Sequence, residues 1–364
     1  MSTGTVIVGH HAVFRSIEPQ NTEGFVILDG REMYRIPAFD KLPPFLMTLV
    51  SDVDLWMYVS SRGGLTAGRA SENRALFPYE TDDKLHLCHG FTGPLTRLRV
   101  HRAQAAPALW QPFAEQAQGA IERNLYKSIL GNRIIFEEIN ASLGVTFRYQ
   151  WCATDAFGFV RTCTLLNHDQ PSPVEVEILD GLVNLLPAGA ELRLQQQSSC
   201  LINAYTRCEV DEATGLGIFA LTSLISDRAE PAESLYANVA WCHGLESAKV
   251  LLSTDQMEAF RQGREIVPEK LLKGRRGAYL VCAKTRLDPG ESRRWHVAAD
   301  AHLDHGRLGT LLATIADRGS VESRLTHETE ASEQSLLRLV ASADGLQSSE
   351  NRHICSSTGV VTGQ

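Results

Sequence analysis

The amino-acid sequence predicts a mostly β protein: a large two-sheet antiparallel supersandwich followed by C-terminal linker helices. Apolar and polar residues alternate through many short segments, which is the period of a half-buried strand. Turn dipeptides such as Asp29-Gly30 separate these segments. Strands and helices do not alternate, no Gly-rich strand-to-helix turn occurs, and no short repeat is visible. These absences argue against a nucleotide-binding α/β fold and against a propeller.

Length and charge limit the classes of protein that need to be considered. The chain has 364 residues, of which 43% are hydrophobic and 21% charged, as in an ordinary globular protein of one large domain or two. A formal net charge of −8 without any basic stripe argues against nucleic acid as a partner. There is no apolar run of about 18 residues and no secretory signal pattern, so we expect no membrane span.

The cysteines indicate the compartment. Eight are scattered through the chain without a C-x-x-C pair, mostly in apolar, strand-like surroundings. This usage is typical of buried free thiols in a reducing compartment and less so of a disulfide framework. We therefore expect a cytoplasmic protein.

The first part of the chain predicts a hairpin and two further strands. Residues 1–20 carry little pattern and are expected to be a lead-in. Residues 24–37 form an apolar run, a turn at Asp29-Gly30 and a return strand. Two more short apolar segments follow within residues 43–61.

Residues 92–103 alternate well enough to predict a strand, whereas residues 107–143 are ambiguous. The middle of the latter segment is helical by composition. The dipeptide Gly131-Asn132 before an apolar run is typical of a hairpin, so we interpret the segment as mostly strand.

The β signal is strong after residue 144. Residues 144–167 predict a strand pair around Asp155-Ala156, and residues 173–181 place valine and isoleucine inward and glutamate outward. Residues 190–205 are either a helix or a long connection. Residues 207–226 predict another hairpin with its turn at 211–215.

A short helix and a last hairpin complete the predicted sandwich. Residues 253–263 indicate a helix with Ser253 or Thr254 as its N-cap and Gly263 near its end. Residues 276–300 predict a hairpin over the turn sequence Asp288-Pro289-Gly290.

Helical periodicity replaces the β pattern near residue 303. Leucine and isoleucine recur at helical spacing from residue 308 to 315, Gly319 ends that helix, and Ser320 can cap a second one running to about Ala343. We therefore expect a sandwich domain at 21–302, a helical linker at 303–345 and a disordered tail at 346–364.

The stretch 58–84 is the most suggestive of function. Its paired glycines, Gly63-Gly64, tolerate positive φ and close approach of a ligand or of backbone. The rest is polar and contains little that suits a buried core, so we interpret it as a long loop. Such a loop either carries function or packs on a neighbouring domain.

No catalytic motif is complete. Asp82 and Asp83 could form part of a glycoside-hydrolysing pair, although solvated loop carboxylates are the simpler interpretation. The patterns His302-x-x-His305 and His86 to His89 could hold zinc, but surface or capping roles are more common for such spacing. There is no G-x-S-x-G nucleophile motif and no P-loop. The tryptophans lie in strand-like runs typical of core packing.

Several segments together resemble the N-terminal region of glycoside phosphorylases related to cellobiose and chitobiose phosphorylase, glycoside hydrolase family 94. They are FVILDGREMYRIP, SSRGGLTAGRASENRALFPYETDDK, FRYQWCATDAFGFVRTCTLLN and TRLDPGESRRWHVAAD. The resemblance covers roughly residues 21–345. It implies a galactose-mutarotase-type supersandwich and linker, which in that family precede an (α/α)6 barrel and a small β layer.

The resemblance implies a role without catalysis for this chain. In that family the catalytic acid and most sugar and phosphate ligands come from the barrel, so no catalytic residue transfers. The whole enzyme would use inorganic phosphate as co-substrate, need no cofactor, act on β-linked glucosides or related oligosaccharides with inversion, and form a homodimer. The residues expected to contact sugar or an interface, or to orient their loop, are Arg62, Arg69, Asn73, Tyr79, Asp82 and Asp83. We also expect that the chain is a truncated product that lacks its barrel.

Two other classes of function stay open. One is a stand-alone carbohydrate-binding or scaffolding β protein. The other is a mutarotase-like enzyme, which predicts a histidine and a carboxylate meeting on one concave sheet face, with His86, His168 or His243 as the histidine.

Overall fold

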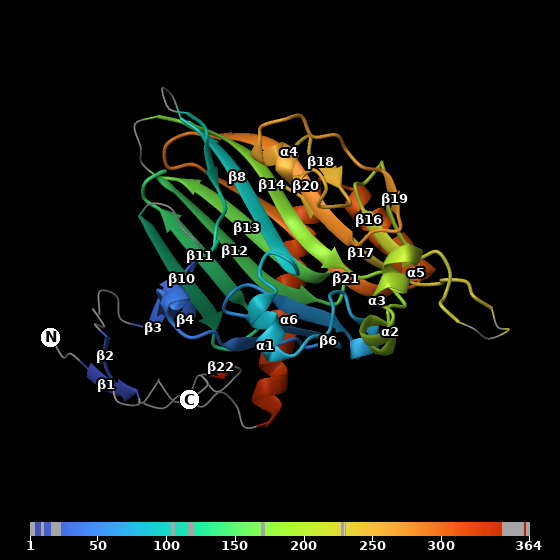
Figure 1. The fold of residues 1–364 in the computed structure, drawn as a ribbon, viewed down its shortest axis with the longest axis horizontal. Helices are drawn as coiled ribbons and strands as arrows, with labels where there is room; N and C mark the ends of the chain where they lie inside the picture. Colours follow the sequence, from blue (N-terminus) through green and yellow to red (C-terminus); the bar gives the residue numbers. More distant parts are fainter. Residues whose placement is uncertain are drawn as a thin grey trace.

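The computed structural model of this chain describes residues 23–102, 106–115, 120–168, 172–226, 229 and 231–343, together with short strands at 4–8, 11–15 and 360–361. The predicted fold class is confirmed: the described part is mostly β, with large antiparallel sheets (Figure 1). The largest sheet has 11 strands. In spatial order they are β19 (Leu271–Lys273), β15 (Thr206–Val210), β16 (Gly217–Leu221), β17 (Ala237–His243), β21 (Ser292–Leu303), β13 (Gly158–Asn167), β12 (Val145–Thr154), β11 (Ile134–Asn140), β10 (Ile121–Ser128), β4 (Arg31–Pro37) and β3 (Gly24–Leu28).

Two smaller sheets share the second layer of the sandwich. One core cluster joins side chains of both with side chains of the large sheet, for example Met57, Val176 and Trp151. The five-stranded sheet contains β18 (Lys249–Leu251), β20 (Gly277–Leu287), β14 (Val174–Leu185), β8 (Gly93–His101) and β9 (Ala108–Trp110). The four-stranded sheet contains β22 (Val360–Val361), β5 (Leu46–Leu49), β6 (Leu55–Ser60) and β7 (Leu65–Arg69), and β1 (Gly4–Val8) pairs with β2 (His11–Arg15).

Helices occupy the rim and one face of the sandwich. The predicted pair near the C-terminus is present as α5 and α6, and its apolar stripe packs on the outer face of the large sheet, where Leu311 and Leu325 meet Val160 and Ala298. No helix in the described ranges is long and apolar enough to cross a membrane. The helices are α1 (Asp82–Leu87), α2 (Leu192–Gln197), α3 (Ser199–Tyr205), α4 (Met257–Arg261), α5 (His305–Ala316) and α6 (Val321–Ala343), with 3-10 turns η1 (Phe39–Lys41) and η2 (Glu72–Arg74).

Local signals predicted these elements well. Asp29 and Gly30 both have positive φ and join β3 to β4, as the Asp-Gly turn requires. The ambiguous segment 107–143 is strand, as we interpreted it. In β14 the valines and isoleucine are buried, whereas Glu175 is exposed. The expected lead-in and tail lie outside the described residues, apart from β1, β2 and β22.

The hairpin predicted over 276–300 is wrong. The turn at 288–290 exists, but β20 pairs with β14 and β18 in the five-stranded sheet, while β21 pairs with β13 and β17 in the large sheet. The connection is therefore an arch between two layers. A turn sequence specifies that the chain reverses, but not whether the reversal lies within a sheet or across the core.

The interpretation of 58–84 as a long polar loop is also wrong. β7 lies within it and is buried at every position, and Leu76 and Phe77 are fully buried. Leu65, Leu76 and Phe77 of this stretch face the core, and the small residues Ala67 and Gly68 let the backbone pack closely. The side chain of Trp56 and the backbone of Arg74 lie where a Cβ on Gly68 would stand.

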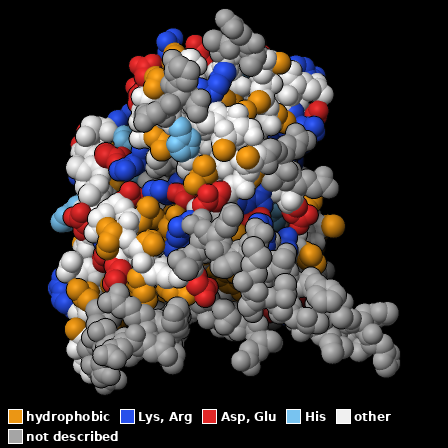
Figure 2. Space-filling model, turned by 90° about the vertical axis from the view of Figure 1, so that its left-hand side faces the viewer, with side chains coloured by type: hydrophobic (Ala, Val, Ile, Leu, Met, Phe, Trp, Pro, Cys, Tyr) orange, Lys and Arg blue, Asp and Glu red, His pale blue; other side chains and the backbone are white. Residues whose placement is uncertain are grey.

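Charges are distributed without a single-sign field on the face shown in Figure 2, where acidic and basic side chains are interspersed.

The predicted N-cap of α4 is shifted: the cap position is Gln256, because the hydroxyl of Ser253 is buried and bonds Glu269 instead. Of the cysteines, Cys152, Cys163 and Cys208 are buried free thiols, as expected, whereas Cys200 is exposed.

Candidate functional site

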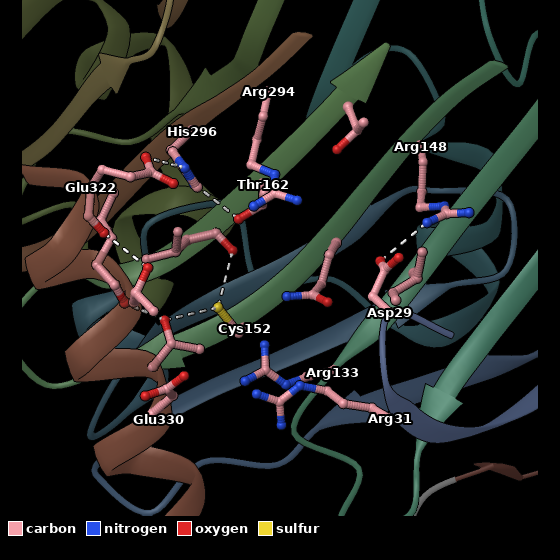
Figure 3. Close-up of a pocket in the computed structure, with 17 residues that line it drawn as sticks. Asp29, Arg31, Arg133, Arg148, Cys152, Thr162, Arg294, His296, Glu322 and Glu330 are labelled. Carbon is pink, nitrogen blue, oxygen red and sulfur yellow. Dashed lines mark hydrogen bonds and ion pairs between the residues drawn. The ribbon is translucent and has the colours of Figure 1, made fainter. Parts of the chain in front are cut away.

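A cavity of about 180 Å³ lies between the outer face of the large sheet and α6 (Figure 3). Strands between β21 and β4 form its floor, and the first half of α6 forms one wall. Four arginines line it, Arg31, Arg133, Arg148 and Arg294, with His296 and the carboxylates of Asp29, Glu322 and Glu330. Hydroxyl, amide and thiol groups and the aliphatic side chains of Ile135, Val160 and Leu325 complete the lining.

The strand period explains how a chain with an apolar core builds this polar surface. In β12, Phe147, Tyr149 and Trp151 point into the core, so the residues between them point outward. Arg148, Gln150 and Cys152 are those outward residues, and all three line the cavity. A rigid sheet therefore holds the polar groups at fixed separations.

Arg148 and Glu137 form the first polar contact of the floor. Nε and Nη2 of Arg148 lie 2.9 and 2.6 Å from Oε2 of Glu137, and Nη1 lies 3.2 Å from Asp29. Glu137 also accepts from the hydroxyl of Tyr126 at 2.8 Å. Burial and this carboxylate raise the pKa of Tyr126. Two donors of the guanidinium thus bond one carboxylate oxygen, and a third bonds Asp29, which fixes the guanidinium plane.

Glu333 attaches α6 to the sheet at one end of the cavity. Its carboxylate accepts from Nη1 of Arg31 at 2.5 Å and from Nη2 of Arg133 at 2.8 Å. Beside it, the hydroxyl of Ser332 donates to Asp52 at 2.5 Å. The two arginines come from different parts of the sheet, so one helical residue joins them.

His296 and Glu322 attach the other end of α6. Nε2 of His296 lies 2.9 Å from Oε2 of Glu322, and Nδ1 lies 3.0 Å from the hydroxyl of Thr162. A carboxylate only accepts, so Nε2 donates to Glu322, and in the neutral ring Nδ1 accepts from Thr162. The hydrogen bond from His296 lowers the pKa of Glu322.

Three polar side chains on the sheet floor of the cavity make no hydrogen bond within the part of the chain that the structure describes. They are Gln150, Thr164 and Arg294, one each on β12, β13 and β21. Together they present an amide, a hydroxyl and a guanidinium to the cavity. Within the same described ranges, no group of three or more His, Cys, Asp or Glu residues is placed to hold a metal ion.

The structure does not bring the residues predicted from 58–84 into this cavity. Arg62 lies in the turn after β6, with Nη1 3.8 Å from Glu115. Asn73 accepts from the backbone N–H of Leu192, and the backbone N–H of Tyr79 donates to Gln195, so both residues contact the α2 segment.

The other predicted residues lie apart as well. Asp82 and Asp83 are exposed in the first turn of α1. Arg69 is buried, and its guanidinium contacts Asp54 at 2.5 Å, Asp300 at 3.2 Å and Asp155 at 3.3 Å. Their roles as sugar or interface contacts stay predictions.

The three candidate histidines lie on different elements. Nδ1 of His86, on α1, lies 2.7 Å from Oγ of Ser60, and Nε2 of His168, after β13, lies 2.8 Å from Oγ1 of Thr146. His243, at the end of β17, is the cross-strand neighbour of His296 and lies near Glu322. The pair of a histidine and a carboxylate on this sheet face is His296–Glu322, which the sequence did not indicate.

Sequence reasoning missed the cavity because its residues come from distant segments. The available signal was the alternation in FRYQWC, which puts a polar face on a core strand, but nothing local connects that face to α6.

Comparisons with known proteins support no family assignment. No family model matches the chain, and no curated protein matches it. Among solved structures, a bacterial glucoamylase complexed with acarbose is similar over 81% of this chain and 36% of its own, at 6% identity and a TM-score of 0.44. A polysaccharide lyase is similar over 74% of this chain and 34% of its own, at 11% identity and a TM-score of 0.38.

A putative aldose 1-epimerase from Klebsiella pneumoniae is similar over 78% of this chain and 91% of its own, at 10% identity and a TM-score of 0.27. The chain spans about a third of the length of the lyase and the glucoamylase. At such TM-scores these similarities assign neither family nor activity.

Proposed function

We propose that this chain is the β-sandwich portion of a carbohydrate-active protein and that the cavity beneath α6 holds part of a saccharide. The observation that carries this proposal is a set of planar and hydroxyl groups on a rigid sheet face, Gln150, Thr164 and Arg294, whose side chains make no hydrogen bond among the described residues. Saccharides present adjacent hydroxyls that donate and accept. A planar amide or guanidinium group can form hydrogen bonds to two adjacent sugar hydroxyls. Side chains on regular strands hold these groups at accurate positions.

The sequence resemblance supports a finer proposal. The whole protein would be a phosphorylase-like enzyme in which an (α/α)6 barrel supplies the catalytic acid and inorganic phosphate attacks the anomeric carbon. This chain would contribute binding and a homodimer interface. Light scattering of the purified chain tests the dimer: a monodisperse monomer at high concentration contradicts it.

Saccharide binding is tested by calorimetry with cellobiose and longer β-linked glucosides. We expect Gln150→Ala and Arg294→Ala to weaken binding at least tenfold, because each removes contacts made only with ligand. The matched control is Arg286→Ala on β20, in the other layer, where the arginine is also exposed. Binding that is equal in the wild type and both cavity variants contradicts the location. No binding of any saccharide contradicts the function.

His296–Glu322 favours a second candidate, mutarotase-like acid–base catalysis. A histidine hydrogen-bonded to a carboxylate can move a proton at a sugar hydroxyl. Polarimetry of freshly dissolved α-D-glucose tests this. Accelerated mutarotation that is lost in His296→Asn but kept in His168→Asn supports it, and a rate equal to that of buffer contradicts it.

A further inference from the structure

A second, smaller cavity of about 80 Å³ lies inside the sandwich, beside the turn Arg62–Gly63. Its floor is aromatic: Phe39, Phe113, Phe136 and Tyr149 line it. Phe136 and Tyr149 stack with their ring centroids 5.0 Å apart, and Phe113 meets Tyr149 edge-on at 5.4 Å. The α6 cavity shares none of these residues.

His89 presents an unused acceptor to this cavity. Within the described part of the chain, its Nε2 is buried without a hydrogen-bond partner, while the ring bonds the backbone of Arg62 through its other nitrogen. Burial lowers the pKa of His89, so the imidazole is neutral near pH 7. A neutral ring that donates from one nitrogen accepts at the other. A buried acceptor without a partner is unfavourable, so a hydroxyl donor that entered the cavity would gain a hydrogen bond to this nitrogen.

Phe113 is held in an unusual backbone conformation at the cavity wall. Its φ is +63°, a left-handed value that a bulky residue rarely adopts. The backbone N–H of Phe113 donates to Oε2 of Glu138 at 2.6 Å, and Glu138 is fixed in turn by Arg123 at 2.7 Å. Strained residues held in this way cluster at ligand sites.

The mouth of the cavity carries both donors and acceptors. Arg62 and Glu115 lie 3.8 Å apart, and Arg123 and Asp40 lie 3.7 Å apart, so both ion pairs are long. Long pairs leave N–H groups and carboxylate oxygens able to bond a ligand. An aromatic floor, one deep acceptor and a mixed polar rim match a ring with an apolar face and hydroxyls at its edge.

We infer that this cavity is a second ligand site, which takes the edge of a sugar ring with a hydroxyl donating to Nε2 of His89 and C–H groups against Phe113. The inference rests on the proposed carbohydrate-binding function, since a non-sugar alcohol with an apolar ring shares the same chemistry. Methyl β-D-glucopyranoside and cyclohexanol are therefore the two probes.

The experiment follows the imidazole nitrogens of His89 by ¹⁵N NMR in the full chain during titration with each probe. We expect the glucoside to shift Nε2 and cyclohexanol to bind at least tenfold more weakly. His89→Phe removes the acceptor and Gly63→Ala places a Cβ 3.3 Å from the His89 ring, so both should weaken glucoside binding at least tenfold. Gly215→Ala is the matched control, because its φ of +81° is similarly strained and nothing lies within 4 Å.

Four outcomes decide between the proposals. Loss of glucoside binding in both variants, with Gly215→Ala unchanged, supports the second site. Binding that survives His89→Phe but is lost in Gln150→Ala overturns the second site and leaves the proposed function standing. Cyclohexanol binding without glucoside binding overturns the sugar assignment, and no Nε2 shift with either probe overturns the site. If His89→Phe does not fold, the wild-type Nε2 shift and Gly63→Ala still decide the question.

Discussion

The guanidinium of Arg161 on β13 lies 2.8 Å from the carboxylate of Asp180 on β14, and neither side chain is exposed. The pair joins the two layers of the sandwich at its centre. Further hydrogen bonds satisfy Asp180, from the hydroxyl of Thr96 at 2.5 Å and from Nε1 of Trp295 at 2.8 Å. A buried ion pair offsets its desolvation only when its other lone pairs are satisfied in this way.

Removing one member of this pair should be strongly destabilising. We expect Asp180→Asn to lower the free energy of unfolding by about 3–5 kcal/mol, because the Arg161 charge is left buried and uncompensated. Urea denaturation at pH 7 measures the change. The control Asp82→Asn, on an exposed helix end, should change stability by less than about 0.5 kcal/mol. A double replacement by Arg161→Met and Asp180→Leu should cost less than Asp180→Asn, and a larger loss would contradict this account.

Glu333 should matter more for the attachment of α6 than its neighbour on the helix. Glu333→Gln weakens charge-assisted bonds to Arg31 and Arg133, so we expect a loss of about 1–2 kcal/mol after allowing for partial exposure. Amide hydrogen exchange of α6 should accelerate with it. Glu330→Gln, an exposed carboxylate without a hydrogen bond within the described part of the chain, is the control. Equal exchange in the two variants would show that the apolar stripe alone holds the helix.

The half-buried imidazole of His89 should make stability depend on pH. Burial lowers the pKa of His89, so below about pH 6.5, the usual value for an unfolded histidine, the unfolded chain binds more protons than the folded one. The contribution of His89 is therefore present above about pH 6.5 and is lost as the pH falls through the lower folded pKa. The difference in free energy of unfolding between pH 7.5 and pH 5 should be smaller in His89→Phe than in the wild type. An unchanged difference would place the titration elsewhere.

Arg69 and Tyr79 should differ sharply in their effect on folding. Arg69→Met removes the cation that Asp54, Asp155 and Asp300 share and leaves Asp155 and Asp300 the longer contacts to Arg307, at 3.5 and 3.6 Å. We expect a loss of about 3–5 kcal/mol, because Asp300 is buried. Tyr79→Ala removes only an edge contact with Trp56 at 5.5 Å, worth about 0.5–1.5 kcal/mol. Thermal denaturation separates the two effects. Cellobiose affinity and assembly state, measured on the folded Tyr79→Ala protein, test its predicted contact role: unchanged values for both would contradict it.

Interactions between residues that are close in the sequence explain which parts of the fold could be predicted. The turn at Asp29-Gly30, the alternation in β14 and the leucine spacing of α5 each depend on neighbouring residues, and each prediction is confirmed. The arch between β20 and β21 depends on which distant strand each one pairs with, so the sequence predicted a hairpin there instead.

The candidate site could not be predicted from the sequence for the same reason. Arg31 and Arg133 are 102 positions apart in the sequence, and they meet only at Glu333. The glycines and charges of the stretch 58–84 are typical of a functional loop, yet the charged side chain that it buries most deeply, Arg69, contacts three aspartates.

The position of β21 has a consequence for the order of folding. This late strand lies in the middle of the large sheet, between β17 and β13, and Phe159 pairs with Ala299 across 140 residues of chain. Until β21 has been synthesised and inserted, β15 to β17 and β3 to β13 are two separate sheet halves with open edges. Pairing over such sequence separations is slow because the loop must close first. During synthesis the exposed edges of both halves are therefore the surfaces that a chaperone would need to protect from aggregation.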